Sequence, residues 1–104
     1  MTKRLWMPFD IGDYLRDTSH LTVTEHGAYM LLIMHYWQNG WLPADEAMIR
    51  RVAKMSTEQW AESRDVLALL FKDNWRHKRI DEEVSKAEQL VEKRRANASA
   101  QHLH

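Results

Sequence analysis

A short basic segment, residues 72–79, holds the side chains best suited to contact a ligand. Its cations are Lys72, Arg76, Lys78 and Arg79. Asp73 is the one acidic residue in the segment, and Trp75 adds an aromatic surface. Such cations bind phosphates, and arginine also enters a narrow minor groove of DNA. The segment predicts weak, salt-sensitive DNA binding, and a merely solvated surface is the alternative interpretation.

Neighbouring segments qualify this prediction. Three more cations, Arg50, Arg51 and Lys54, lie on the polar side of a helix expected over residues 46–54 and would add phosphate contacts. The next helix is acidic on its polar face, because Glu58, Glu62 and Asp65 outnumber Arg64. Carboxylates repel the DNA polyanion, which disfavours base-specific recognition. The alternative function is therefore a protein–protein interaction adaptor with no nucleic-acid role.

Residue patterns typical of catalysis, metal binding or cofactor binding are absent from the sequence. The chain has no Cys and three Gly, which excludes thiolate chemistry and a glycine-rich phosphate loop. His20 and His26 lie near Asp10, Asp13 and Asp17, but their spacing matches no metal-ligand motif. We expect a non-catalytic protein with no cofactor and no metal.

The composition is typical of one soluble domain. The 104 residues are 44% hydrophobic and 29% charged, with 15 cations and 15 anions. A chain of this size has room for one core. The longest apolar stretch, residues 28–37, is shorter than the about 20 residues of a membrane-spanning helix. We therefore expect no membrane association.

The first strong helix begins after Thr22. Thr22 and Glu25 form a capping box, and Asn39-Gly40 is a typical helix end. The preceding residues, 1–21, form an arm with one short helical turn and many apolar side chains. We expect this arm to pack on the domain, since its apolar residues would otherwise be exposed.

Two further helices are predicted by their caps. Asp45 precedes the helix over 46–54, and Ser56 opens a helix over 57–70. Two helices joined by a short turn indicate a helix-turn-helix.

A β-hairpin is expected next, with Asp73-Asn74 at its turn. Both residues accept the positive φ of two-residue hairpin turns, and residues 70–72 and 75–80 would be the short strands. The element order then predicts a mostly α, winged-helix-like domain over residues 1–96.

The aromatic residues and His26 suggest specific contacts. Trp37 and Trp60 stand at core positions of their helices, and we expect Trp41 and Trp75 to pack on each other. We expect His26 to form a hydrogen bond with the arm.

A long helix is predicted from Asp81 onward. Val84, Ala87 and Val91 form a narrow apolar stripe on it, which suits a partner helix or a second copy. A solvated helix is the alternative. Residues 97–104 lose the pattern and are expected to fray.

Several sequence blocks resemble the YdaU-like family of phage- and prophage-encoded proteins. The blocks are Trp6-Met7-Pro8, Ile11-Gly12-Asp13-Tyr14-Leu15, Glu25-His26-Gly27-Ala28-Tyr29 and His77-Lys78-Arg79-Ile80-Asp81-Glu82-Glu83. The family is a domain of unknown function that resembles the amino-terminal domain of phage replisome-organiser proteins. The resemblance implies a replication-associated role in the cytoplasm of a bacterial host. Its partners would be replication proteins or a carboxy-terminal region missing from this chain.

Overall fold

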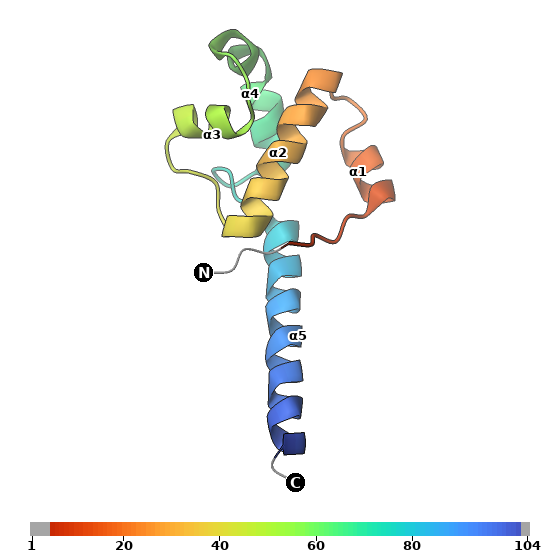
Figure 1. Ribbon diagram of the computed structural model, residues 1–104. Helices are drawn as coiled ribbons and strands as arrows, with labels where there is room; N and C mark the ends of the chain where they lie inside the picture. Colours follow the sequence, from red (N-terminus) through yellow and green to blue (C-terminus); the bar gives the residue numbers. More distant parts are fainter. Residues whose placement is uncertain (1–4, 103–104) are drawn as a thin grey trace.

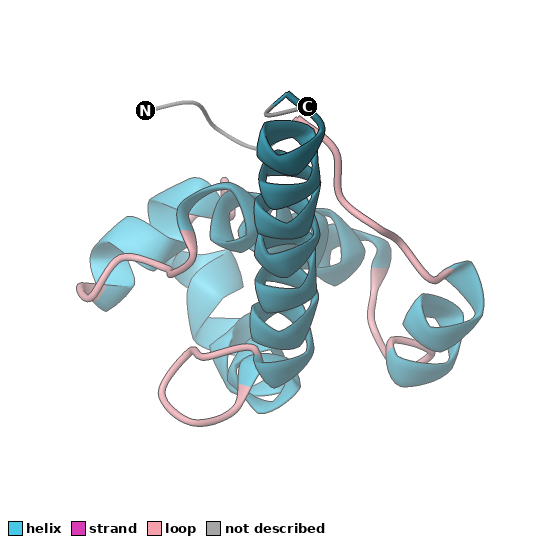
Figure 2. Cartoon of the chain, turned by 90° about the horizontal axis from the view of Figure 1, so that it is seen from below, coloured by secondary structure: helices cyan, strands magenta, loops and turns pink. Residues whose placement is uncertain are grey.

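The computed structural model describes residues 5–102, with side chains through residue 97, and shows five helices (Figure 1). The chain is mostly α, as predicted, and no described residue lies in a β-strand (Figure 2). A body of four helices sits at one end, and the fifth helix projects from it, so that the long axis measures 62 Å against 29 and 22 Å.

Local capping explains where the first helices begin and end. Helix α1 (Ile11–Asp17) starts at Asp10, whose carboxylate accepts from the amide of Asp13. Helix α2 (Val23–Asn39) starts with the predicted capping box of Thr22 and Glu25 and ends at Gly40, where φ is +84°. Glycine adopts this left-handed conformation without a Cβ clash.

Helices α3 (Glu46–Val52) and α4 (Thr57–Phe71) form the predicted pair, joined by residues 53–56. Ser56 and Gln59 cap α4 reciprocally. Glu46 links the two helices, because its carboxylate accepts from the indole N–H of Trp60 and pairs with Arg64.

Helix α2 is the centre of the core and contacts α3, α4 and α5. Its Leu32 and Tyr36 are fully buried, as is Leu67 of α4. The core predictions for Trp37 and Trp60 are confirmed, since both are buried.

The predicted β-hairpin is wrong. Residues 72–77 form a loop, and α5 (Lys78–His102) begins where the second strand was expected. Lys72, Asp73, Asn74 and Trp75 all have positive φ, and the amide of Arg76 donates to the carbonyl of Lys72 over 2.9 Å. The loop is therefore a single left-handed turn. An isolated two-stranded ribbon is marginal in water, whereas this turn buries part of Trp75 and His77.

The contact predicted between Trp41 and Trp75 is also wrong. Trp75 stacks on Trp60 with ring centroids 5.6 Å apart, and Trp41 is exposed. Trp75 therefore packs against α4, whereas Trp41 lies in the loop before Pro43.

The amino-terminal arm packs less closely than expected. Tyr14 and Met7 contact the core, but Leu5, Trp6, Ile11 and Leu15 are exposed. The indole N–H of Trp37 donates to the carbonyl of Trp6 over 2.6 Å, so the arm is held by its backbone rather than by these side chains.

Helix α5 continues through His102, beyond the point where fraying was expected. Alanine has the highest helix propensity, and Ala96, Ala98 and Ala100 fall in this last part. Residues 103–104 of the expected tail lie outside the described residues.

Candidate functional site

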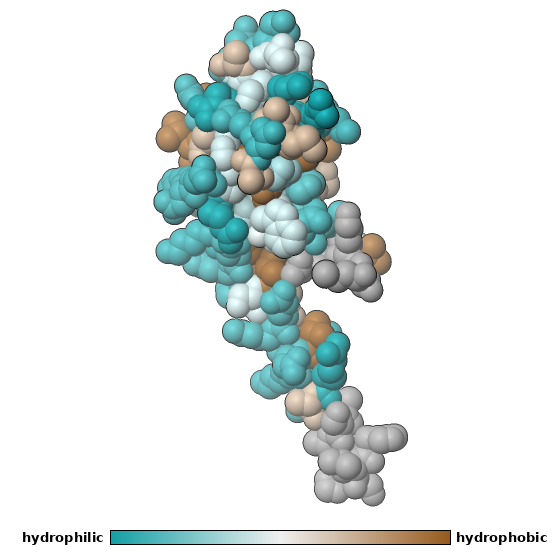
Figure 3. Space-filling model, turned by 90° about the vertical axis from the view of Figure 1, so that its left-hand side faces the viewer, coloured by the Kyte–Doolittle hydropathy of each residue, from teal (hydrophilic) through white to brown (hydrophobic). Residues whose placement is uncertain are grey.

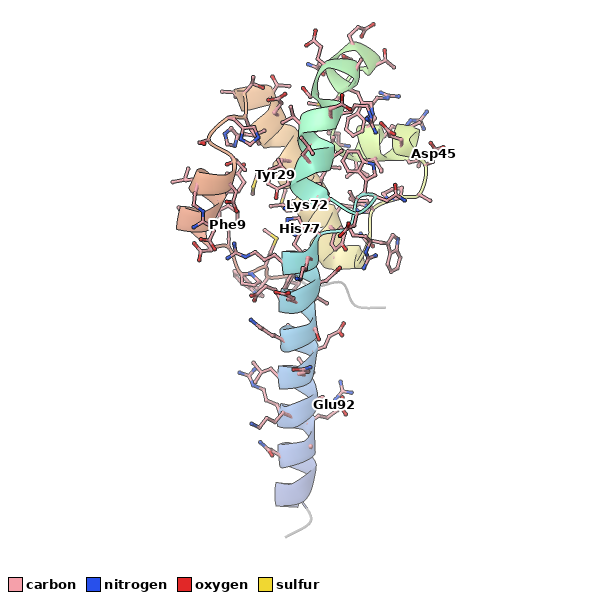
Figure 4. All side chains as sticks on the ribbon, turned by 180° about the vertical axis from the view of Figure 1, so that it is seen from behind. Phe9, Tyr29, Asp45, Lys72, His77 and Glu92 are labelled. Carbon is pink, nitrogen blue, oxygen red and sulfur yellow. The ribbon has the colours of Figure 1, made fainter. Side chains whose placement is uncertain are left out.

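The start of α5 is built around His77. Its ring lies among three aromatic side chains, with centroid distances of 5.3 Å to Phe71, 6.3 Å to Tyr36 and 6.4 Å to Tyr29. Figure 4 shows His77 at the top of α5, below Tyr29 of α2. The side chain thus joins α2, the end of α4 and α5 at one point.

Hydrogen bonds fix the protonation of His77. Its Nδ1 accepts from the amide of Ile80 over 3.2 Å, which makes His77 the cap of α5. The proton of the neutral ring is therefore on Nε2, which lies 3.0 Å from the Tyr29 hydroxyl and donates to it. Burial lowers the pKa of His77 and raises the pKa of Tyr29 to about 12. Both groups are neutral near pH 7 and have hydrogen-bond partners, which suits a structural role.

Tyr36 ties the same turn to α2. Its hydroxyl accepts from the amide of His77 over 3.1 Å and donates to Asp81 over 2.7 Å. Asp81 also pairs with Arg76 at 3.1 Å, and the Arg76 guanidinium lies 5.6 Å from the centre of the Tyr36 ring. The first turn of α5 is therefore anchored to the body from two sides.

The arm contacts the other side of this turn. Arg79 pairs with Asp13 and lies 3.7 Å from Asp10, and its hydrogen bond lowers the pKa of Asp13. The Tyr14 hydroxyl lies 2.7 Å from Nδ1 of His26, which confirms the predicted contact between His26 and the arm.

A cavity of 710 Å³ opens between the arm, α2, the end of α4 and the start of α5. Apolar walls come from Ile33, Trp37 and Leu70, and polar groups come from Asp17, Lys72 and Glu83. These polar side chains carry both signs of charge, and no described contact joins them to one another. The cavity therefore indicates no reaction and no particular ligand.

The seven cations predicted to bind DNA divide into two groups. Arg76 and Arg79 are in ion pairs, and Arg50 donates to the carbonyl of Met55 over 2.8 Å. The others are exposed and make no ion pair with the described residues; they are Arg51, Lys54, Lys72 and Lys78. The structure thus leaves four of the seven cations free to contact a phosphate.

The predicted partner stripe runs from the body onto the projecting part of α5. Val84 packs against the core, Ala87 is half-buried, and Val91 is 51% exposed. Leu90, which lies one position off the predicted stripe, is 48% exposed beside Val91. Figure 3 shows apolar residues on this part of α5 within a mostly hydrophilic surface.

Comparison with known proteins identifies the family. The profile of a family described as a protein of unknown function, DUF1376, matches residues 5–85. The chain belongs to the DUF1376 family. It is also 38% identical over 98 residues to the uncharacterized protein YdaU of Escherichia coli strain K12, a match that covers 91% of this chain. These findings confirm the resemblance to YdaU-like proteins.

The match covers 34% of YdaU, so this DUF1376 chain spans about a third of the length of that relative. The family profile ends at residue 85, close to where α5 leaves the body. No solved structure matches the sequence.

Two other features bear on the kind of site. No helix of the described DUF1376 chain is both long and apolar enough to span a membrane. Across residues with described side chains, no three His, Asp or Glu side chains gather closely enough to hold a metal ion.

Proposed function

We propose that this chain is a non-catalytic module that associates with another protein through α5. The observation that carries the proposal is the exposed helix itself. Its first turn is fixed to the body by His77, Tyr36 and Arg79, while Leu90 and Val91 lie on the projecting part with about half of their surface exposed.

The physics of helices supports a partner for this segment. An isolated helix is marginal in water, and most helical stability in proteins comes from packing of an apolar face. Beyond Val84, α5 has few contacts with the body, and Ala87 and Val91 continue the stripe at heptad spacing. A second helix laid along this stripe would bury it.

The family resemblance suggests the setting. The resemblance implies a phage or prophage setting, and on that ground we propose a replication-associated role in the cytoplasm of a bacterial host. The partner would be a replication protein, a further region of a longer chain, or a second copy.

Site-specific photo-crosslinking in the intact chain tests the association. A photoreactive phenylalanine derivative replaces Val91 in one variant and Gln89 in the other. Both positions are exposed, but Gln89 lies on the opposite face of α5. We expect a discrete protein adduct from position 91 and little from position 89. Equal adducts from the two positions, or none from either, would refute the proposal.

DNA binding is the second candidate function. The observation in its favour is the exposure of Arg51, Lys54, Lys72 and Lys78 without ion pairs to described residues. Few phosphate contacts give weak binding that falls steeply with salt. The remaining predicted cations are already engaged, which makes this candidate weaker than protein association.

Fluorescence anisotropy with a short DNA duplex tests the second candidate. The variant K54E/K72E/K78E removes three free cations, and K86E/K93E/R94E, which makes the same change in net charge at exposed positions of α5, is the matched control. We expect binding at low salt that the first variant abolishes and the control retains. Binding that persists in the triple variant would exclude these cations as the site.

A further inference from the structure

The amino-terminal arm covers the cavity without filling it. Phe9 and Tyr14 of the arm line one side of the cavity, and Ile33 of α2 and Leu70 of α4 line the other. Helix α1, which belongs to the arm, has no buried residue and stands apart from α2 (Figure 1). A space of 710 Å³ therefore lies where close packing would otherwise join the arm to the body.

Much of the apolar surface of the arm faces solvent. Leu5 and Trp6 are 84% and 87% exposed, and Ile11 and Leu15, one turn apart on α1, are 65% and 61% exposed. Burial of apolar surface is the dominant favourable term in folding. These four side chains therefore contribute little to holding the arm against the body.

Hydrogen bonds attach the arm to α2 at both ends of the cavity-lining segment. The carbonyl of Trp6 accepts from the indole N–H of Trp37 over 2.6 Å. The hydroxyl of Tyr14 lies 2.7 Å from Nδ1 of His26, and its ring stacks on Tyr29 with centroids 6.0 Å apart. Such hydrogen bonds give a modest net stabilisation, because water replaces them when they break.

An ion pair attaches the arm to α5. Arg79 pairs with Asp13 and lies 3.7 Å from Asp10. The side chains of Arg79 and Asp10 are about half exposed, at 47% and 54%. Water and salt weaken ion pairs at this exposure, so this attachment is also readily broken.

The turn that follows α1 is held more firmly. Thr18 is 1% exposed and Leu21 is 9% exposed, and the amide of Leu21 donates to the carbonyl of Thr18 over 3.0 Å. Among the described residues, the buried apolar side chains of the core all lie at position 21 or beyond. Residues 5–17 can therefore leave the body while the core stays packed.

We propose that residues 5–17 form a releasable strap, which pivots on residues 18–21 and controls access to the cavity. In the closed state, the hydrogen bonds to α2 and the ion pair with Arg79 hold the strap in place. When they break, the cavity wall at Ile33 and Leu70 becomes open to large molecules. Because Arg79 belongs to α5, a displacement of the first turn of α5 also loosens the strap. This inference is independent of the proposed association, since every contact lies within one chain.

Thiol labelling of the intact chain tests the strap. The chain has no Cys, so I33C and L70C each place one thiol on the cavity wall, and I49C places one in the core away from the cavity. The reagent is a maleimide attached to a long polyethylene glycol chain, which is too bulky to enter the closed cavity. It reacts at positions 33 and 70 when the strap opens, and at position 49 when the domain unfolds. We expect labelling at 33 and 70 to be several-fold faster than at 49, and several-fold slower than in urea-unfolded chains.

Two arginine variants distinguish the attachment from a general weakening of α5. Arg79→Ala removes the ion pair with the strap, whereas Arg76→Ala removes the pair with Asp81 and leaves the contacts of the strap in place. Arg79→Ala should accelerate labelling at positions 33 and 70 several-fold without changing position 49, and Arg76→Ala should not. Added salt should accelerate labelling at 33 and 70 in the presence of Arg79 and have little effect in Arg79→Ala.

Three results would overturn the strap. Equal labelling rates at positions 33, 70 and 49 would mean that the wall is reached only by unfolding of the domain. Labelling at 33 and 70 as fast as in urea would mean that the arm does not cover the wall. Equal effects of Arg79→Ala and Arg76→Ala would mean that the ion pair with Asp13 does not hold the arm.

Discussion

Replacement of His77 by Ala removes several contacts at the start of α5 at once. The variant loses the cap on the amide of Ile80, a change that typically costs about 1 kcal/mol. It also leaves the buried Tyr29 hydroxyl without its donor, which costs about 1–3 kcal/mol. Loss of ring packing against Phe71 adds about 1 kcal/mol. The expected decrease in the free energy of unfolding is about 3–5 kcal/mol, a large share of the about 5–15 kcal/mol typical of a domain.

A matched variant isolates the cap. His77→Asn also loses the ring, but its side-chain oxygen can accept from the amide of Ile80, since Asn is a strong capping residue. We expect His77→Asn to be about 1 kcal/mol more stable than His77→Ala. Urea unfolding followed by tryptophan fluorescence measures both, because Trp60 and Trp75 stack close to the site. A loss below about 1 kcal/mol in His77→Ala, or equal stability of the two variants, would refute the assigned role of His77.

Three further predictions concern stability. Burial lowers the pKa of His77, so the unfolded chain binds a proton more readily; the free energy of unfolding should fall as pH drops below about 6.5, and His77→Asn should flatten this dependence when urea unfolding is repeated across pH. Trp75→Ala should lower stability by at least about 1 kcal/mol, with Trp75→Phe in between, because stacking on Trp60 is lost; unchanged urea midpoints would contradict the stacking. Gly27→Ala should stabilise α2 by about 0.5–1 kcal/mol, since a Cβ there meets nothing within 4 Å, whereas Gly40→Ala should destabilise it because φ is +84°; thermal unfolding that shifts in the same direction for both would be inconsistent with these conformations.

The caps and the central helix could be predicted from the sequence because they depend on neighbouring residues. Thr22 with Glu25, and Ser56 with Gln59, satisfy amides within four residues of themselves, so their types alone indicate where α2 and α4 begin. Gly40 likewise marks the end of α2, since its conformation is a local property of glycine.

The segment after α4 could not be predicted in this way. Asp73-Asn74 accepts positive φ equally well in a hairpin and in the left-handed turn observed. The choice is made by Trp75 stacking on Trp60 and by His77 entering the cluster around Tyr36, contacts that link residues 15 and 41 positions apart. The hydrophobic pattern of a six-residue segment contains no information about such partners.

The same limit applies to the predicted site. Whether a cation is free depends on what the fold places beside it, and Arg79 is engaged because the arm brings Asp10 and Asp13 to it. By contrast, the stripe of Val84, Ala87 and Val91 was visible in the sequence, because periodicity alone places these residues on one side of a helix. Leu90 was missed because it lies one position off that spacing, at the edge of the stripe.

Helix α5 also sets a length scale. At 1.5 Å per residue, the stretch from Val84 to His102 extends about 27 Å beyond the helical body, and its direction is fixed at its base by Tyr36 and Asp81. Whatever is joined to the far end is therefore kept at a set distance and orientation from the arm and the cavity. Because this spacer is rigid, the number of residues in it sets both the distance and the orientation of whatever follows. Inserting one residue would lengthen the helix by about 1.5 Å and rotate everything beyond it by about 100° around the axis.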